Sequence, residues 1–159
     1  CTSRYSQTSS DKQLISLNIA KAKISPISLQ IPFGWKEINA NDSTFIDLWL
    51  VSEDFKSSLS LIPLNNDSKD QNLEQWKFIS KLSNKMKYKN SGVEFIDEDS
   101  IELNEITIAI YKFTHKDHYY RVCIFEHQKR FYELTALEEN EKNIAIISDI
   151  QNSVLASLK

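Results

Sequence analysis

Apolar and polar residues alternate in several short stretches near the start of the chain. The run "ISLQI" (27–31) alternates and stops at Pro32, and "FIDLWLVS" (45–52) and "SSLSLIPL" (57–64) follow with a short polar link between them. Successive strand side chains point to opposite faces, so such runs predict β-strands. The preceding stretch "LISLNIAKAKI" (14–24) is ambiguous between strand and helix, and we interpret it as extended structure.

The period changes to that of a helix between residues 67 and 89. Apolar side chains recur there every three or four positions, which places them on one helix face. That face is expected to consist of Leu73, Trp76, Ile79, Leu82 and Met86. Lys77, Lys81 and Lys85 recur on another face, which we interpret as a solvated surface rather than a basic docking patch.

Four further strand-like runs follow, at 93–99, 105–113, 119–127 and 130–137. The last two links are short enough for hairpins, so these strands are expected to form an antiparallel meander. A closing helix is expected from about Asn140. Its apolar stripe consists of Ile147, Ile150, Val154 and Leu158.

The runs "ITIAIYKF" and "VCIFE" carry apolar residues on both of their alternating faces rather than on one. A sheet that faces water on one side shows alternation, so two-sided apolar strands indicate cover on both faces. We therefore expect an α+β fold: a three-layer α/β/α sandwich with a central, mainly antiparallel sheet and a C-terminal helix. Residues 13–159 are expected to form this single domain, and residues 1–12 a flexible tether.

The composition excludes several classes of function. The 159 residues carry a formal net charge of −3, and only Arg4, Arg121 and Arg130 offer guanidinium groups, so we expect no nucleic-acid partner. Gly34 and Gly92 are the only glycines. Glycine-rich phosphate loops need several positions without Cβ, which excludes nucleotide binding by those routes.

The first residues, "CTSRYSQTSSDK", combine a cysteine with a polar stretch. They resemble the processed N-terminus of a bacterial lipoprotein, in which the thiol of the first cysteine carries a lipid. We therefore expect lipidation at Cys1, with a polar tether that has too little apolar surface to fold. The alternatives are that Cys1 is simply where a fragment begins, or that it forms a disulfide with Cys123.

The segment "HKDHYY" contains the most suggestive chemistry. His115, Asp117 and His118 lie within it, and with His127 they supply zinc-type ligands. However, His118 and His127 lie at opposite ends of one expected strand, roughly 30 Å apart. We therefore interpret the segment as an exposed polar turn and expect no metal site.

Other candidate sites are weaker. An acidic run could attract calcium, but it lacks the spacing and the glycine of a calcium loop. The run contains Glu94, Asp97, Glu98, Asp99, Glu102 and Glu105. Ser57, Ser58 and Ser60 have no activating neighbours in the sequence, and Cys123 lies among apolar residues. We expect no catalytic residues, no cofactor and no enzyme activity.

Two segments carry a resemblance to a known family: "ISLQIPFGWKEI", with Pro32, Gly34 and Trp35, and the ending "RVCIFEHQKRFYELTALEENEKNIAIISDIQNSVLASL". With the order of elements, they resemble the PsbP-like family over roughly residues 27–158. That family includes the photosystem II extrinsic protein, a eukaryotic Ran-binding relative and many bacterial lipoproteins. The resemblance implies a non-enzymatic binding or assembly module, often exported, with no functional residue carried over.

We therefore expect a monomeric, lipid-anchored domain of the bacterial cell envelope that binds a protein or a small ligand. The alternatives are a soluble adaptor or secretion chaperone of the same fold, or a metal-dependent envelope hydrolase with His115 and His118 as ligands. For packing, we expect Trp35, Trp76 and Ile150 to be buried. The side chains expected to be exposed are His115, Asp117 and Lys81.

The lipid hypothesis predicts the effect of Cys1→Ser in a precursor with its native signal peptide. The variant should leave the membrane fraction, because each buried CH₂ of an acyl chain contributes ~0.8 kcal/mol to membrane binding. Fractionation with immunodetection measures this. Membrane association equal to that of the unchanged protein would reject lipidation at Cys1.

Overall fold

The fold is built around one large sheet, seen in a computed structural model that describes residues 3–4, 14–39, 45–64 and 71–159. Its strand order is β1-β7-β8-β9-β10-β6-β5-β4, and β2 (Ile15–Lys21) and β3 (Ser28–Pro32) form a separate pair. The strands of the large sheet are β1 (Ser3–Arg4), β4 (Trp35–Glu37), β5 (Leu48–Ser52), β6 (Ser57–Pro63), β7 (Glu94–Leu103), β8 (Ile106–His115), β9 (His118–His127) and β10 (Arg130–Glu138). Among the strands that the structure describes, only β1 runs parallel to its neighbour, β7.

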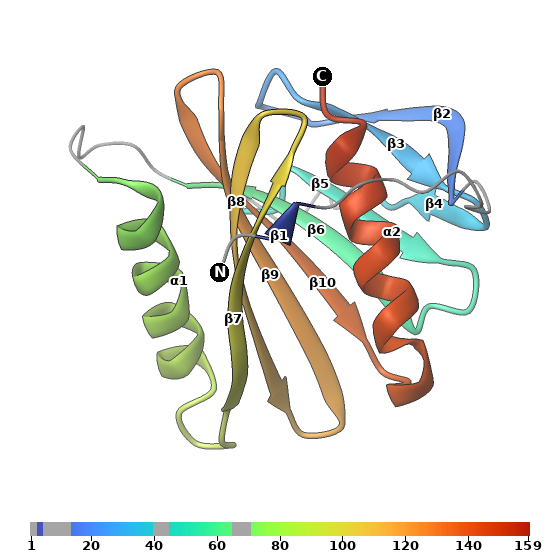
Figure 1. Cartoon of the computed structure of the whole chain (residues 1–159). Coiled ribbons are helices and arrows are strands. Elements are labelled where there is room, and N and C mark those ends of the chain that lie inside the picture. The colour runs from blue at the N-terminus through green and yellow to red at the C-terminus, as the bar shows by residue number, and fades with distance from the viewer. Residues whose placement is uncertain (1–2, 5–13, 40–44, 65–70) are drawn as a thin grey trace.

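Helices lie on both sides of the sheet, as Figure 1 shows. Helix α1 (Leu73–Lys87) packs against β8 and β9. Helix α2 (Ile144–Ala156), preceded by a 3₁₀ turn at Glu141–Asn143, covers the opposite face together with the β2–β3 pair. The expected three-layer α+β sandwich with a C-terminal helix is confirmed.

The two apolar faces of the meander pack into two separate hydrophobic cores. On the α2 side, Ile108 and Ile110 join a cluster that extends over β2, β3 and α2. On the α1 side, Ala109, Tyr111 and Phe113 join the smaller cluster around Trp76. Because side chains alternate along a strand, β8 needs cover on both faces, which explains the three layers.

Helix α1 is rotated relative to the expectation from its sequence. Trp76 is buried as expected, but Leu82 and Met86 are 46% and 68% exposed, so their assignment to the buried face was wrong. Ser80 and Asn84 lie against the sheet instead, and both bind the Tyr111 hydroxyl. The apolar period could not show this, because the helix is anchored by polar groups that it shares with β8.

Asp117 is exposed as predicted, but the predicted burial or exposure of four other residues was wrong: Trp35, Ile150, Lys81 and His115. Trp35 and Ile150 are half-buried because both line an open cavity. Lys81 is half-buried because it pairs with Glu98. His115 is 8% exposed rather than solvated, because a ring and a backbone carbonyl cover it.

The beginning of the chain is described only in part. Ser3 and Arg4 lie in β1 and pair with Ile101 and Glu102 of β7. The remainder of the expected tether, with Cys1, falls outside the described residues, so the tether and its lipid stay predictions. Neither described helix combines the length and apolar character needed to cross a membrane.

The rotation of α1 predicts opposite results at two neighbouring aromatic residues. Trp76→Ala should lower the free energy of unfolding by about 3–5 kcal/mol, because it empties a core position. Phe78→Ala is the matched control. Phe78 is 66% exposed, so its truncation should change stability by less than about 0.5 kcal/mol. Urea unfolding followed by circular dichroism measures both, and equal losses would contradict this orientation of α1.

Candidate functional site

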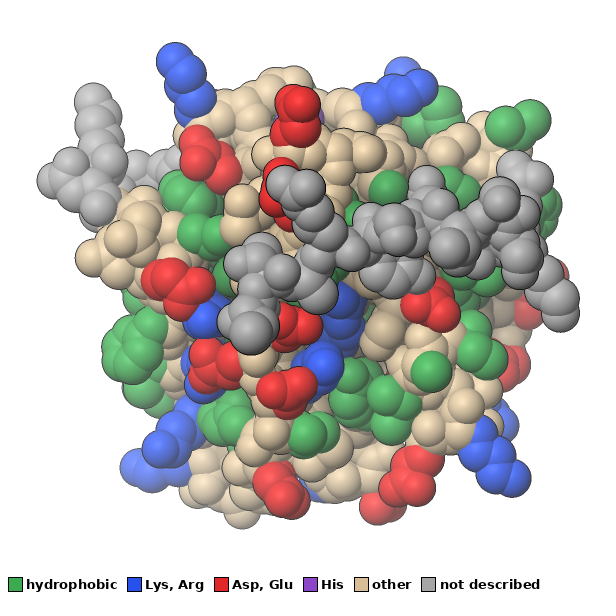
Figure 2. Space-filling model, in the orientation of Figure 1, with side chains coloured by type: hydrophobic (Ala, Val, Ile, Leu, Met, Phe, Trp, Pro, Cys, Tyr) green, Lys and Arg blue, Asp and Glu red, His purple; other side chains and the backbone are tan. Residues whose placement is uncertain are grey.

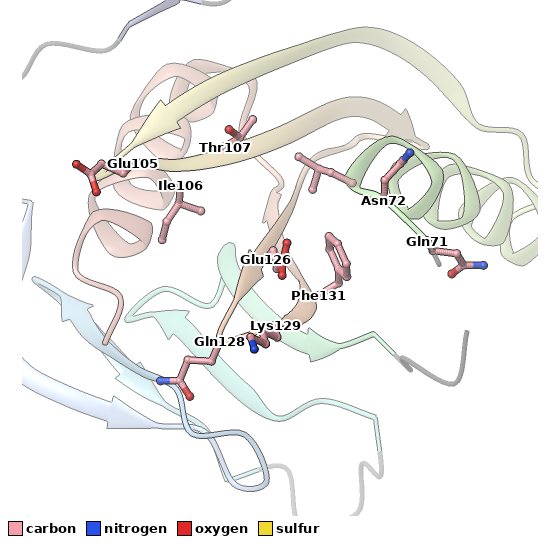
Figure 3. Close-up of a pocket in the computed structure, with 10 residues that line it drawn as sticks. Gln71, Asn72, Glu105, Ile106, Thr107, Glu126, Gln128, Lys129 and Phe131 are labelled. Atoms are coloured by element: carbon pink, nitrogen blue, oxygen red, sulfur yellow. The ribbon is translucent and has the colours of Figure 1, made fainter. Parts of the chain in front are cut away.

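A groove of about 790 Å³ lies where α1 begins, between the tips of the β7–β8 and β9–β10 hairpins. Residues 71–73 form one wall, residues 105–107 form another, and four residues from 126 to 131 complete the lining. Figure 3 shows Glu126 and Phe131 projecting into the space between these elements. The volume is within the range of small-molecule and peptide-binding pockets, about 300–1,000 Å³.

The α1 wall is fixed by a capping box. The Asn72 side chain accepts a hydrogen bond from the Gln75 backbone N–H (3.0 Å), and the Gln75 side chain accepts one from the Asn72 N–H (2.8 Å). These bonds satisfy N–H groups that a helix start leaves open. Next to the cap, the side-chain oxygen of Gln71 is buried and has no hydrogen-bond partner among the described residues. Gln71 lines the groove, whereas this oxygen itself is closed to solvent.

The two hairpin tips hold charged residues in an unusual backbone conformation. Asn104 and Glu105 have φ of 48° and 68°, and Gln128 and Lys129 have φ of 50° and 63°. Two successive positive φ values define the tight turn that fits a two-residue hairpin, and glycine is favoured at its second position. Glu105 and Lys129 occupy that position and line the groove. Backbone strain of this kind is frequent at binding sites.

The groove combines an apolar floor with an acceptor-rich rim. Leu73, Ile106 and Phe131 supply apolar surface, and Glu105 and Glu126 supply exposed carboxylates. These two carboxylates outnumber the single ammonium of Lys129. The arrangement suits a ligand that carries a positive charge or several N–H donors beside an apolar group.

A chain of hydrogen bonds fixes α1 to the sheet beside the groove. Asn84 donates to the Tyr111 hydroxyl (2.7 Å), Tyr111 donates to Ser80 (2.5 Å), and Ser80 donates to Glu133 (2.5 Å). Glu133 also accepts from Thr135 (3.0 Å), and as a carboxylate it sets the direction of the chain. Burial, with the negative charge of Glu133, raises the pKa of Tyr111, so its phenol keeps its proton.

The histidines of the expected turn have separate structural partners. The Nδ1 atom of His115 donates to the Gly92 carbonyl (2.8 Å), and its ring stacks on Tyr88 with centroids 4.2 Å apart. His118 contacts Glu139 at 3.3 Å. His127 lies at the far end of β9. In the part of the chain that the structure describes, no three His, Cys, Asp or Glu side chains gather as metal ligands do.

Apart from Glu105 in the β7–β8 turn, the acidic run lies in β7 and is spread over both faces of that strand. Glu98 binds Lys77 and Lys81 of α1, whereas Asp97 binds Lys112 of β8 (3.2 Å). The hydrogen bond from Lys81 is the main reason that the pKa of Glu98 is lowered. These carboxylates therefore secure α1 and β8 to the edge of the sheet.

A second cavity, of about 390 Å³, lies between α2 and the β5–β6 turn. Its buried carboxylate, Glu138, accepts hydrogen bonds from the Ser57 hydroxyl (2.5 Å) and from the Asn140 N–H (2.8 Å). Ser57 is therefore a donor to a fixed carboxylate. Its described contacts include no histidine that could act as a base.

Cys123 is fully buried, and this burial raises the pKa of its thiol. A raised pKa lowers the thiolate fraction, so Cys123 has neither the access nor the ionisation of a nucleophile. Arg121 is only 4% exposed and donates to Gln151 (2.6 Å) and to the Cys123 sulfur (3.3 Å). It therefore serves packing under α2.

The groove was not among the sites expected from the sequence. Its residues come from three segments that are far apart in the chain, and none of them forms a motif. One signal was present: "NE" (104–105) and "QK" (128–129) are two-residue hairpin turns without glycine. Turn residues of poor local propensity can mark a position that is retained for binding.

No family model matches the chain, and no curated protein matches it. Solved structures do match the fold of this chain. Cyanobacterial PsbP (CyanoP) from Synechocystis matches with a TM-score of 0.68 and 9% identity, over 98% of this chain and 97% of that one. The Saccharomyces cerevisiae Ran-binding protein Mog1p matches with a TM-score of 0.56 and 12% identity, over 91% of this chain and 96% of that one. The chain has the PsbP-like fold that its sequence resembles.

The histidine geometry predicts that two substitutions at one turn have different effects. His115→Ala should lower the free energy of unfolding by about 1–3 kcal/mol, because it leaves the Gly92 carbonyl without its donor and removes the contact with Tyr88. His118→Ala, which removes one longer contact with an exposed carboxylate, should change stability by less than about 0.5 kcal/mol. Thermal unfolding at neutral pH compares them. A larger loss for His118→Ala would contradict the assigned roles.

Proposed function

We propose that this protein is a non-enzymatic, lipid-anchored binding domain of a bacterial cell envelope. Its ligand is a segment of a partner protein that places a Lys or Arg side chain in the groove at the start of α1. The observation that carries this proposal is the set of acceptors around an apolar floor, with Glu105 and Glu126 at the rim.

The chemistry of the groove supports a cationic protein segment. A guanidinium or ammonium group can bond to the exposed carboxylate of Glu126 or of Glu105. The methylene groups of such a side chain can pack on Phe131 and Ile106 at the same time. Lys129 at the far wall disfavours a second positive charge and so limits the orientation of the ligand.

Binding rather than catalysis is favoured by how the candidate reactive groups are used. Ser57, Ser80 and His115 each hold a structural hydrogen bond, and Cys123 is buried. The fold itself is found in PsbP and in a Ran-binding protein, which supports a role in binding or assembly. Anchoring is proposed from Cys1 and the polar residues after it.

Site-specific photo-crosslinking in the native envelope tests the groove. A photoreactive phenylalanine analogue at Thr107, inside the groove, should give a cross-linked protein product. The matched control places the analogue at Lys116. This exposed residue lies at the opposite end of the sheet, in the β8–β9 turn, and should not give that product.

Charge reversal then tests the role of the carboxylates. Glu105→Lys with Glu126→Lys should lower the yield of the Thr107 product by about tenfold or more, because reversal replaces attraction by repulsion. Glu141→Lys with Glu53→Lys, at exposed positions away from the groove, should leave the yield unchanged. A product that persists after reversal in the groove, or that forms equally from Lys116, would refute the proposed site.

A further inference from the structure

Helix α1 has a second apolar face that no described part of the chain covers. Phe78, Leu82 and Met86 are 66%, 46% and 68% exposed. They recur every four residues, so they line up along one side of the helix. That side is opposite to Trp76 and Ser80, which are buried. We refer to Phe78, Leu82 and Met86 as the outer face of α1.

The same helix is strongly basic in a protein with a formal net charge of −3. Residues 75–93 contain five lysines and no Asp or Glu. Two of these, Lys77 and Lys81, pair with Glu98 of β7. The other three, Lys85, Lys87 and Lys89, are exposed near the end of the helix.

Apolar and basic side chains therefore share one surface. Figure 2 shows hydrophobic side chains over α1 at the left margin of the molecule, with basic side chains beside and below them. An amphipathic helix with an apolar line flanked by lysines is typical of a helix that lies in a membrane interface. The lysines add attraction to an anionic lipid surface.

We propose that the outer face of α1, with Lys85, Lys87 and Lys89, is a docking surface for an anionic membrane. The apolar side chains enter the interface, and the ammonium groups contact lipid phosphates. The first described strand, β1, pairs with β7, the strand whose Glu98 holds α1. The surface therefore complements the proposed lipid on Cys1, but it does not depend on that lipid.

Two other occupants fit the outer face less well. A second copy of the chain, packed symmetrically through α1, would set lysines against lysines. A standard protein interface uses about 20–30 residues a side, whereas this apolar line is only about 12 Å long. A lipid surface needs neither a matching shape nor a large buried area.

Vesicle co-sedimentation tests the proposal with the full chain carrying Cys1→Ser, so that no acyl chain contributes. The protein should sediment with vesicles of phosphatidylcholine that contain about one quarter phosphatidylglycerol, and not with phosphatidylcholine alone. Added salt should weaken the binding, because it screens the lysines. No sedimentation with the anionic vesicles at low salt would overturn the proposal.

Matched variants locate the contact. Phe78→Ser/Leu82→Ser/Met86→Ser and Lys85→Gln/Lys87→Gln/Lys89→Gln should each reduce the bound fraction by about fivefold or more. Leu17→Ser/Ile24→Ser, at residues that are 83% and 75% exposed on the β2–β3 side, should bind as the unchanged protein does. So should Lys21→Gln/Lys116→Gln/Lys142→Gln, at exposed positions off α1. Circular dichroism confirms that each variant is folded.

Equal losses in the α1 variants and their controls would overturn the proposal. It would also be overturned if sedimentation equilibrium showed a dimer of the unchanged protein that the Phe78/Leu82/Met86 variant lost. That result would assign the outer face of α1 to a second copy of the chain. Because the vesicle assay uses neither the groove nor a protein partner, its failure would leave the proposed binding function standing.

Discussion

The architecture depends on the two-sided burial of the meander. Ile108 and Ile110 of β8 face one core, and Tyr111 and Phe113 of the same strand face the other. A strand of this kind cannot leave either face in water without exposing large apolar side chains. The need for cover on both faces therefore sets the positions of α1, of α2 and of the β2–β3 pair.

On the α1 side, the contact between helix and sheet is partly polar, and this fixes one rotation of the helix about its axis. The chain of hydrogen bonds from Asn84 through Tyr111 and Ser80 to Glu133 fixes the rotation of the helix. A half-buried carboxylate and a buried phenol are costly without partners, so a rotated helix would lose these bonds and leave both groups unsatisfied. This specificity has a consequence: with Ser80 turned inward, Leu82 and Met86 face outward.

The groove and the outer face of α1 follow from the same placement of the helix. The start of α1 lies beside two hairpin tips, which brings the wall at Gln71 opposite Glu105 and Lys129. The remainder of the helix presents lysines and apolar groups on its far side. The two proposed interactions thus use different surfaces of one element, a protein ligand at its start and a membrane along its length.

Local patterns in the chain were enough for most of the strands, for both α-helices and for the number of layers, because period and two-sided apolar runs report directly on which faces are covered. The short strands β1 and β4 were not expected. They also led to the PsbP-like fold. They could not show that Ser80 rather than Leu82 faces the sheet, since the partner that decides this, Tyr111, lies on another element. The burial of His115 under Tyr88 and the assembly of the groove have the same origin: each depends on contacts between residues far apart in the chain, which only the packed structure brings together.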